Sequence, residues 1–273
     1  MRIAFFGDVV GKPGRRILSE VLPRLRVDLK LDFVILNAEN AADNGFGVTE
    51  AVANELFQSG ADCLTLGNHS WDQREALTFI SRDPRVLRPA NYPSLTQAPG
   101  RGANLFQLRD RTVLVVSVMG RLFMDSLDCA YSAVEREVSA CPLGLAADAI
   151  VVDVHAEATS EKQGIAHFLD GRASLVVGTH THVPTADARI LGGGTGFITD
   201  LGMCGDYDSV IGMKKDVSVR RQSIRLPGPR VESATGPGMA CGVVVELGGN
   251  GLCRRIEPLR IGTGLAEHIP EFS

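Results

Sequence analysis

The chain has 273 residues, of which 44% are hydrophobic and 22% are charged, and its formal net charge is -4. This length and composition predict a globular protein with a large core, and the acidic balance argues against a broad basic surface for duplex nucleic acid. No apolar run is long enough to span a bilayer and the opening MRIAFFGD has no signal-peptide character, so we expect no membrane association and a cytoplasmic location.

Short runs of β-branched and aliphatic residues recur along the chain and predict strands. Their apolar character is continuous rather than alternating, which is typical of strands covered on both faces. In chain order the runs are RIAFFGD, DFVILNAEN, DCLTLGNH, TVLVVSVMG, AIVVDVHAE, SLVVGTHTH, GFITDLGM and CGVVVELGG.

Helical patterns lie between several of these runs, and Ser160 with Gln163 fits a capping box. The alternation of strands and helices predicts a layered α/β fold. No repeat or low-complexity linker divides the chain, so we expect a single domain over residues 1–273, with a mobile Pro- and Gly-rich excursion at 225–238. The predicted helices span 15–30, 49–58, 72–80 and 160–169.

The six cysteines are scattered and form no C-x-x-C pair. Several of them lie in apolar runs. We interpret them as small buried residues of a protein from a reducing compartment, rather than as metal ligands or a disulfide framework.

Residues with metal-binding or acid–base chemistry fall where the predicted strands end. In open α/β sheets, ligands bind outside the carboxyl ends of the strands. Four of the six histidines belong to this set, which random scatter would rarely produce. The set is Asp8, Glu39, Asn40, Asn68, His69, His155, His180 and His182.

Carboxylates, amides and imidazoles together form a mixed oxygen and nitrogen donor set, which suits manganese, iron or zinc. The donors outnumber the needs of one tetrahedral ion, so the sequence predicts two metal ions, with Glu39 able to bridge them. A metal pair about 3.5–4 Å apart activates water and holds both oxygens of an in-line phosphoryl displacement. Hydrolysis of a phosphate ester is therefore the predicted chemistry.

The motifs GD, GNH and GTHTH resemble those of the calcineurin-like metallophosphoesterase superfamily, whose core is a four-layer α/β/β/α sandwich. The usual Asp-x-His motif is absent because Val10 follows Asp8 and Val9, and LNAEN supplies Glu39 and Asn40 instead. With NAENAADNGFG, LGNHSWD, VDVHAEATSEK and VGTHTHVPTAD, the chain resembles the bacterial 2′,3′-cyclic-nucleotide 2′-phosphodiesterase family from Asp8 to about Met213.

This resemblance implies a dimetal phosphodiesterase, with iron or manganese favoured over zinc. A metal-activated hydroxide would attack phosphorus, and His69 would protonate the leaving 2′-oxygen, giving 3′-AMP from 2′,3′-cyclic AMP. The expected partner is a small phosphodiester, and a homo-oligomer is compatible with this interpretation. The implied ligands are Asp8, Asn40 and His182 on one ion, Asn68, His155 and His180 on the other, and Glu39 bridging both.

Other interpretations of the same residues stay open at the sequence level. The site could serve phosphomonoesters or another phosphodiester, because ligands define the reaction class and loops define the substrate. A nucleotide- or RNA-binding regulatory protein with incidental hydrolysis is a further alternative. Asp8 could cap the following helix, and NAEN could form a turn through side-chain hydrogen bonds.

Some neighbouring residues receive minor interpretations. We interpret Asp72 as an acidic residue in a first helical turn rather than as a partner of His69. Gly67 and Gly178 are expected to let the backbone approach the metals without a Cβ clash. Arg121 and the basic run at 214–225 are candidates for attracting a substrate phosphate, although such runs usually form solvated faces.

Overall fold

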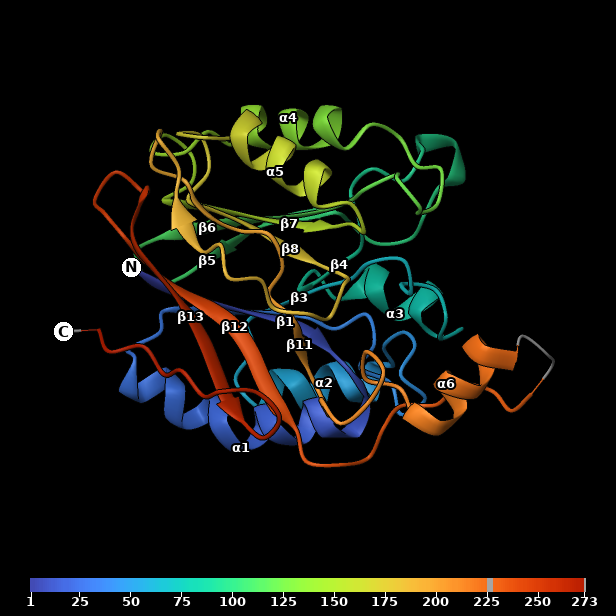
Figure 1. Cartoon of the computed structure of the whole chain (residues 1–273). Coiled ribbons are helices and arrows are strands. Elements are labelled where there is room, and N and C mark those ends of the chain that lie inside the picture. Colours follow the sequence, from blue (N-terminus) through green and yellow to red (C-terminus); the bar gives the residue numbers. More distant parts are fainter. Residues whose placement is uncertain (225–227, 273) are drawn as a thin grey trace.

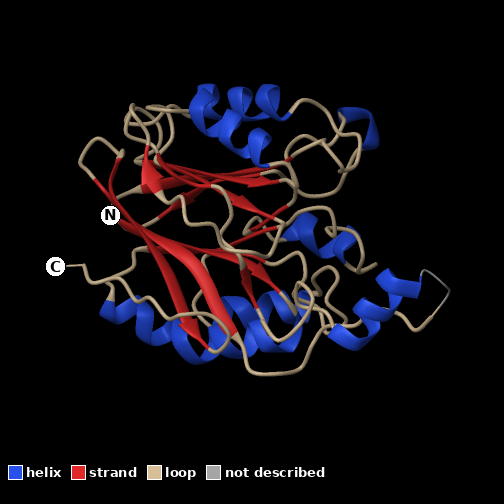
Figure 2. Ribbon diagram, viewed as in Figure 1, coloured by secondary structure: helices blue, strands red, loops and turns tan. Residues whose placement is uncertain are grey.

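A computed structural model describes residues 1–224 and 228–272 of the chain. Two β-sheets pack face to face, and helices cover their outer faces (Figures 1 and 2). The predicted four-layer α/β/β/α sandwich is confirmed. No helix within the described residues is long and apolar enough to cross a membrane.

The first sheet has the strand order β13-β12-β1-β2-β3-β4, with β11 also paired to β1. Strands β1, β2, β3 and β4 run parallel. The strand bounds are β1 Arg2–Val9, β2 Phe33–Asn37, β3 Cys63–Thr65, β4 Val86–Leu87, β11 Met203–Cys204, β12 Met239–Leu247 and β13 Cys253–Gly262.

The second sheet has the order β5-β6-β7-β8-β10-β9, in which β6, β7, β8 and β10 are parallel. Its strands are β5 Ala103–Gln107, β6 Thr112–Met119, β7 Ala149–His155, β8 Leu175–Thr179, β9 Arg189–Ile190 and β10 Gly196–Ile198.

Helices α1 and α2 cover the outer face of the first sheet, and α4 and α5 cover that of the second (Figure 1). α6 projects from the side of the sandwich. The helix bounds are α1 Gly11–Asp28, α2 Glu50–Gln58, α3 Ala76–Arg82, α4 Ala130–Ala140, α5 Thr159–Phe168 and α6 Lys215–Ile224, with a 3₁₀ turn at Ser94–Thr96.

Strand β1 shows why the apolar runs do not alternate with polar residues. Ala4 and Phe6 face the helices, whereas Ile3 and Phe5 enter the core between the sheets. Successive side chains of a strand point to opposite faces, so a strand buried on both faces must be apolar at every position. The continuous apolar character predicted from the sequence has this cause.

Three predictions of local structure are wrong. The run GFITDLGM, predicted as one strand, instead contains β10 of the second sheet and the start of β11 of the first. The predicted helix at 72–80 begins instead at Ala76, so Asp72 lies in the preceding turn. The capping box at Ser160 does not form, because α5 begins at Thr159 and Ala158 is its N-cap, with no side-chain hydrogen bond. By contrast, Thr49 caps α2, and its hydroxyl accepts a hydrogen bond from the Val52 N–H.

The Pro- and Gly-rich segment at 225–238 lies partly outside the described residues, at 225–227. In its described part, Ser233 and Ala234 are buried. The cysteines are all free, and four of them are buried, as the sequence predicts.

Candidate metal centre

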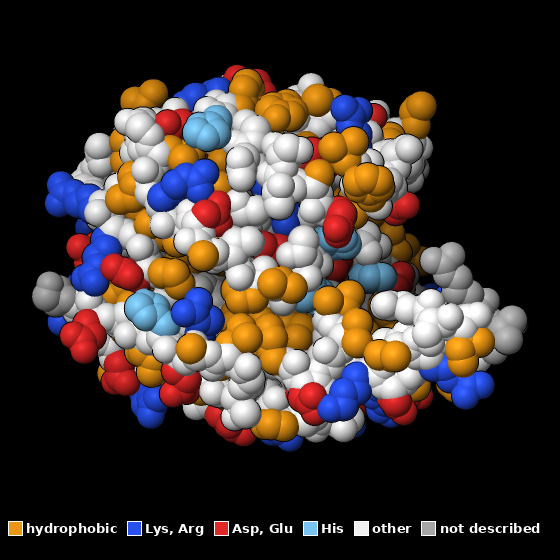
Figure 3. Space-filling view, in the orientation of Figure 1, with side chains coloured by type: hydrophobic (Ala, Val, Ile, Leu, Met, Phe, Trp, Pro, Cys, Tyr) orange, Lys and Arg blue, Asp and Glu red, His pale blue; other side chains and the backbone are white. Residues whose placement is uncertain are grey.

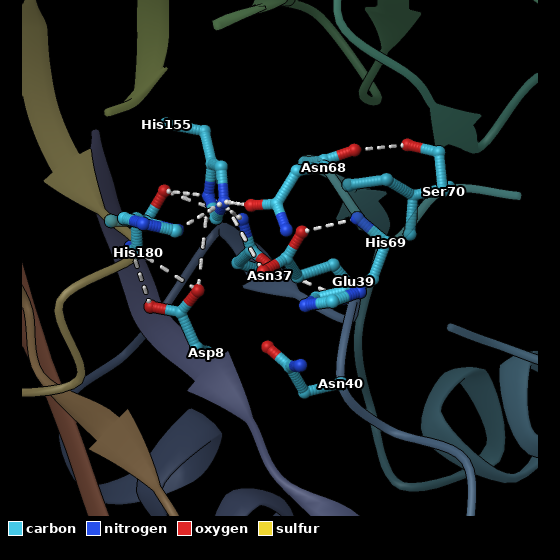
Figure 4. A network of polar contacts seen from close by, with 12 residues as sticks. Asp8, Asn37, Glu39, Asn40, Asn68, His69, Ser70, His155 and His180 are labelled. Carbon is cyan, nitrogen blue, oxygen red and sulfur yellow. Dashed lines mark hydrogen bonds and ion pairs between the residues drawn. The ribbon is translucent and has the colours of Figure 1, made fainter. Parts of the chain in front are cut away.

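The parallel strands of both sheets end at the same side of the sandwich, and the predicted site residues meet there (Figure 4). From the first sheet come Asp8, in β1, and four residues that follow β2 and β3, namely Glu39, Asn40, Asn68 and His69. From the second sheet come His155, at the end of β7, and His180 and His182, which follow β8. The structure therefore brings together every predicted site residue, from segments as far apart as β1 and the end of β8.

The first group of donors surrounds His155. Its Nε2 lies 3.1 Å from Glu39 Oε1, 3.0 Å from Asn68 Oδ1 and 3.1 Å from His180 Nδ1. One ring nitrogen carries a single hydrogen or lone pair and cannot satisfy three polar neighbours. Ligand atoms that share an ion at about 2.1 Å lie about 3.0 Å apart when their bonds are perpendicular. The spacing fits a common cation.

The second group contains Asp8, Glu39 and His182, whose ligand atoms lie within 4.8 Å of one another, as do those of Glu39, His155 and His180. His182 Nε2 also lies 3.3 Å from Asn40 Oδ1. Because Glu39 belongs to both groups, the two sets of donors fit a dinuclear centre with a shared carboxylate.

Burial and neighbouring charges raise the pKa of Asp8 and lower the pKa values of Glu39 and His180. Burial raises the pKa of Asp8 to about 6, against the opposing effect of His182 and His155. For Glu39, burial is outweighed by the charge and hydrogen bond of His155, and the pKa falls to about 2. Burial, together with the charge of His155, lowers the pKa of His180 to about 3. The site thus favours an ionised Glu39 and a neutral His180.

Two of the histidines are oriented by hydrogen bonds to their other ring nitrogen. The Ile211 carbonyl lies 2.8 Å from His182 Nδ1 and can only accept, so Nδ1 donates and Nε2 is left free for an ion. His155 Nδ1 lies 2.9 Å from the Thr179 hydroxyl, which donates to Asp153 at 2.7 Å. This series of hydrogen bonds likewise leaves His155 Nε2 available as a ligand.

The loop that carries His180 and His182 has an unusual backbone. Both residues have positive φ, at 100° and 65°, a region that residues with a Cβ rarely adopt. Asp200 holds the loop between them, since its Oδ2 accepts the Thr181 N–H at 3.1 Å. The same oxygen lies 2.7 Å from Lys162 Nζ, and both side chains of this ion pair are buried.

Sequence reasoning missed the Lys162–Asp200 pair, although a signal was present. Lys162 lies three and four residues before Ile165 and Ala166, which are on the buried face of α5. A lysine at a core-facing position of an amphipathic helix indicates a buried partner.

His69 lies directly after Asn68 and lines the cavity beside the metal centre. Its backbone N–H donates to Glu39 Oε2 at 3.0 Å, which fixes the position of the residue. Its Nδ1 lies 2.8 Å from Asp72 Oδ2. The interpretation of Asp72 as a helix-dipole residue is therefore wrong: because α3 starts later, Asp72 is free to orient the imidazole.

The two glycines have different roles. A Cβ on Gly67 would collide with the His155 ring and with Glu39 Oε2, so this glycine allows close approach to the metal centre, as predicted. A Cβ on Gly178 would instead collide with the Thr199 carbonyl. Gly178 therefore serves packing against the segment after β10, and the prediction for it is wrong.

The basic residues predicted to attract a substrate phosphate differ in whether they line the cavity. Arg121 is exposed, and its backbone N–H donates to Glu161, but it does not line the cavity. Of the basic run, Lys214 and Lys215 form ion pairs with Glu232 and Asp208, while Arg221 lines the cavity. Arg225 lies outside the described residues.

Asp8 is not a helix cap, because Val10 is the N-cap of α1 and the Asp8 carboxylate accepts the His180 N–H. In NAEN, Asn37 Oδ1 does accept the Glu39 N–H, as a turn requires. Glu39 and Asn40 nevertheless turn their side chains toward the histidines (Figure 4).

Known proteins share both sequence and fold with this chain. Residues 4–259 match the family described as YmdB-like protein. A 2′,3′-cyclic-nucleotide 2′-phosphodiesterase of Bacillus subtilis (strain 168) is 44% identical over 247 residues, covering 90% of this chain and 91% of that protein.

Two solved structures have the same fold over nearly their full length. A hypothetical protein from Thermus thermophilus superposes with a TM-score of 0.89 at 40% identity, covering 97% of this chain and 100% of that one. A structure described as a novel phosphatase from Mycoplasma pneumoniae gives a TM-score of 0.89 at 30% identity, covering 96% and 93%.

Proposed function

The chain belongs to the YmdB-like protein family, and from this premise we propose that it is a metal-dependent phosphodiesterase that hydrolyses 2′,3′-cyclic nucleotides to 3′-nucleotides. The observation that carries the proposal is the convergence of two donor groups on Glu39, with His69 beside them. When bound, a metal pair supplies an activated water and neutralises charge on the phosphoryl oxygens.

In this proposal the ligands divide as the family resemblance implies. Asp8, Asn40 and His182 would hold one ion, Asn68, His155 and His180 would hold the other, and Glu39 would be shared by the two sets. The proximity of Asn40 Oδ1 to His182 Nε2, and of Asn68 Oδ1 to His155 Nε2, supports this division.

His69 acts as the general acid of the proposed reaction. Its Nδ1 is held by Asp72, so its Nε2 is the ring nitrogen available to give a proton to the leaving 2′-oxygen. The bond from phosphorus to the 2′-oxygen breaks, a water oxygen takes its place on phosphorus, and the phosphate stays on the 3′-oxygen.

We further propose iron or manganese as the native metal. The donors are carboxylates, amides and imidazoles, without a thiolate, and such a mixed oxygen and nitrogen set suits iron and manganese. We also propose that the enzyme acts on free small diesters and that it is located in the cytoplasm. The free cysteines support the location, because such thiols persist in reducing compartments. Self-association stays a prediction that light scattering would test.

The test is hydrolysis of 2′,3′-cyclic AMP by manganese-loaded protein, with the product isomer identified by chromatography and phosphomonoesters run alongside. We expect 3′-AMP, and we expect His69→Ala to keep its metal content while kcat falls about 100- to 10,000-fold. His167→Ala, at an exposed histidine on α5, is the matched control and should behave as wild type. Absence of turnover by protein with both metals bound would refute the substrate assignment.

A further inference from the structure

The cavity over the metal centre extends well beyond the ligands. It has a volume of about 470 Å³, and one part of its lining consists of the site residues Glu39, His180 and His182. A second part, called here the second half of the cavity, consists of apolar side chains and residues of α6. Figure 3 shows the histidines at the bottom of a hollow, with the projecting α6 region as one wall. A phosphodiester alone would leave this second half of the cavity empty.

The floor of this second half is a fixed apolar surface. Phe46 and Val231 pack against a small buried cluster that contains Val10, Met203 and Met213. The Phe46 ring lies 5.0 Å from the His69 ring, in an edge-on arrangement. The apolar floor therefore begins immediately beside the proposed general acid.

The chemistry of the proposed substrate places a nucleobase near His69. His69 protonates the oxygen on C2′ of the ribose, and the base is attached to the neighbouring carbon, C1′. A base must therefore lie within a few bonds of His69, and the face of a nucleobase stacks well on aromatic and apolar side chains.

Arg221 and Gln222, on α6, form a further wall of the cavity. Both side chains are exposed, and neither has a hydrogen-bond or ion-pair partner within residues 1–224 and 228–272. The other cations at the start of this segment, Lys214 and Lys215, are both paired. A planar guanidinium can stack on a base, and a carboxamide can both donate to and accept from a base edge.

We propose that this half of the cavity is a nucleobase subsite, in which the purine or pyrimidine lies between the apolar floor (Phe46, Met213 and Val231) and the α6 wall (Arg221 and Gln222). The proposal rests on the proposed function, because it places the base by the position of the leaving oxygen. In this arrangement, contacts of the base with α6 let the enzyme distinguish nucleotides from simpler cyclic phosphodiesters.

The test compares 2′,3′-cyclic AMP with methyl riboside 2′,3′-cyclic phosphate, which has the same reacting diester and no base. We expect wild type to prefer the nucleotide by about 10-fold or more in kcat/KM. In Arg221→Ala/Gln222→Ala the KM for the nucleotide should rise, and the ratio of the two kcat/KM values should fall toward one. Arg220→Ala, an exposed arginine of α6 that does not line the cavity, is the matched control and should keep the wild-type ratio.

A binding measurement separates failure of the subsite from failure of the proposed function. Calorimetry would compare 3′-AMP with methyl riboside 3′-phosphate, without any turnover. Equal kcat/KM for both diesters and equal affinities for both products would overturn the subsite while leaving the phosphodiesterase intact. If neither diester is hydrolysed with metals bound, the proposed function fails. Tighter binding of 3′-AMP by wild type than by the double variant would then still support the subsite, and equal binding would overturn it.

Discussion

Replacing Lys162 by methionine tests whether a buried ion pair holds the histidine loop in place. Methionine keeps the length and apolar stem of lysine but removes its charge. Asp200 would remain buried, with the backbone N–H groups of Thr181 and Gly202 as its donors. The loop that carries His180 and His182 in strained conformations would lose the lysine that anchors its acceptor.

The expected cost follows from the geometry. Unit charges 2.7 Å apart attract by about 6 kcal/mol at an effective dielectric constant of about 20. Part of this attraction offsets the desolvation of the two groups, and breaking a buried pair on one side costs about 3–5 kcal/mol in measured cases. We therefore expect Lys162→Met to lower the free energy of unfolding by about 3–5 kcal/mol.

The assay is urea unfolding of the metal-free proteins at pH 7, followed by metal content after reconstitution. Lys215→Met is the matched control, since Lys215 forms an ion pair with Asp208 at a similar distance, 2.6 Å, but at an exposed position. It should cost less than about 1 kcal/mol. If Lys162→Met unfolds within about 1 kcal/mol of wild type and binds metal normally, the pair has no anchoring role.

Two further predictions concern single carboxylates. Asp72→Ala should lower kcat by roughly 10-fold with unchanged metal content and KM, because His69 loses the group that orients it; an unchanged kcat would contradict this role. Burial disfavours ionised Asp187, but hydrogen bonds from Thr199 and Thr185 outweigh it and lower its pKa from 3.8 to about 2. Its contribution to stability is therefore complete above pH 3.8 and is lost as the pH falls through 2. Unfolding curves between pH 5 and pH 2 should show a smaller loss of stability in Asp187→Asn than in wild type, and parallel losses would contradict the assignment.

The central strands and the site were predictable because both leave strong local signals. A strand buried on two faces must be apolar throughout, and polar residues where such a strand ends have few structural reasons to be there. Edge strand β13 is different. It contains Arg254, Arg255 and Pro258, because within the described residues β12 is the one strand that pairs with it, and its sequence does not resemble the central runs.

The residues missed by sequence reasoning act through contacts that no short window contains. Lys162 and Asp200 are 38 residues apart and meet only when α5 packs on the second sheet. Helix α6 itself was not predicted, for another reason. The helix has Ser218 as its buried residue, so it lacks the apolar periodicity that usually reveals a helix and its packing face.

The proposed metal ligands come from both sheets, so metal binding would affect the stability of the whole molecule. In the proposed division, each ion would be held from both sheets, one by Asp8 with His182 and the other by Asn68 with His155 and His180, and would therefore cross-link the two halves of the sandwich. By mass action, each ion present at 100 times its Kd adds about 2.7 kcal/mol to the stability of the joined state. Metal supply in the cell would then govern how firmly the two sheets hold together, and metal starvation would expose the protein to proteolysis as well as inactivate it.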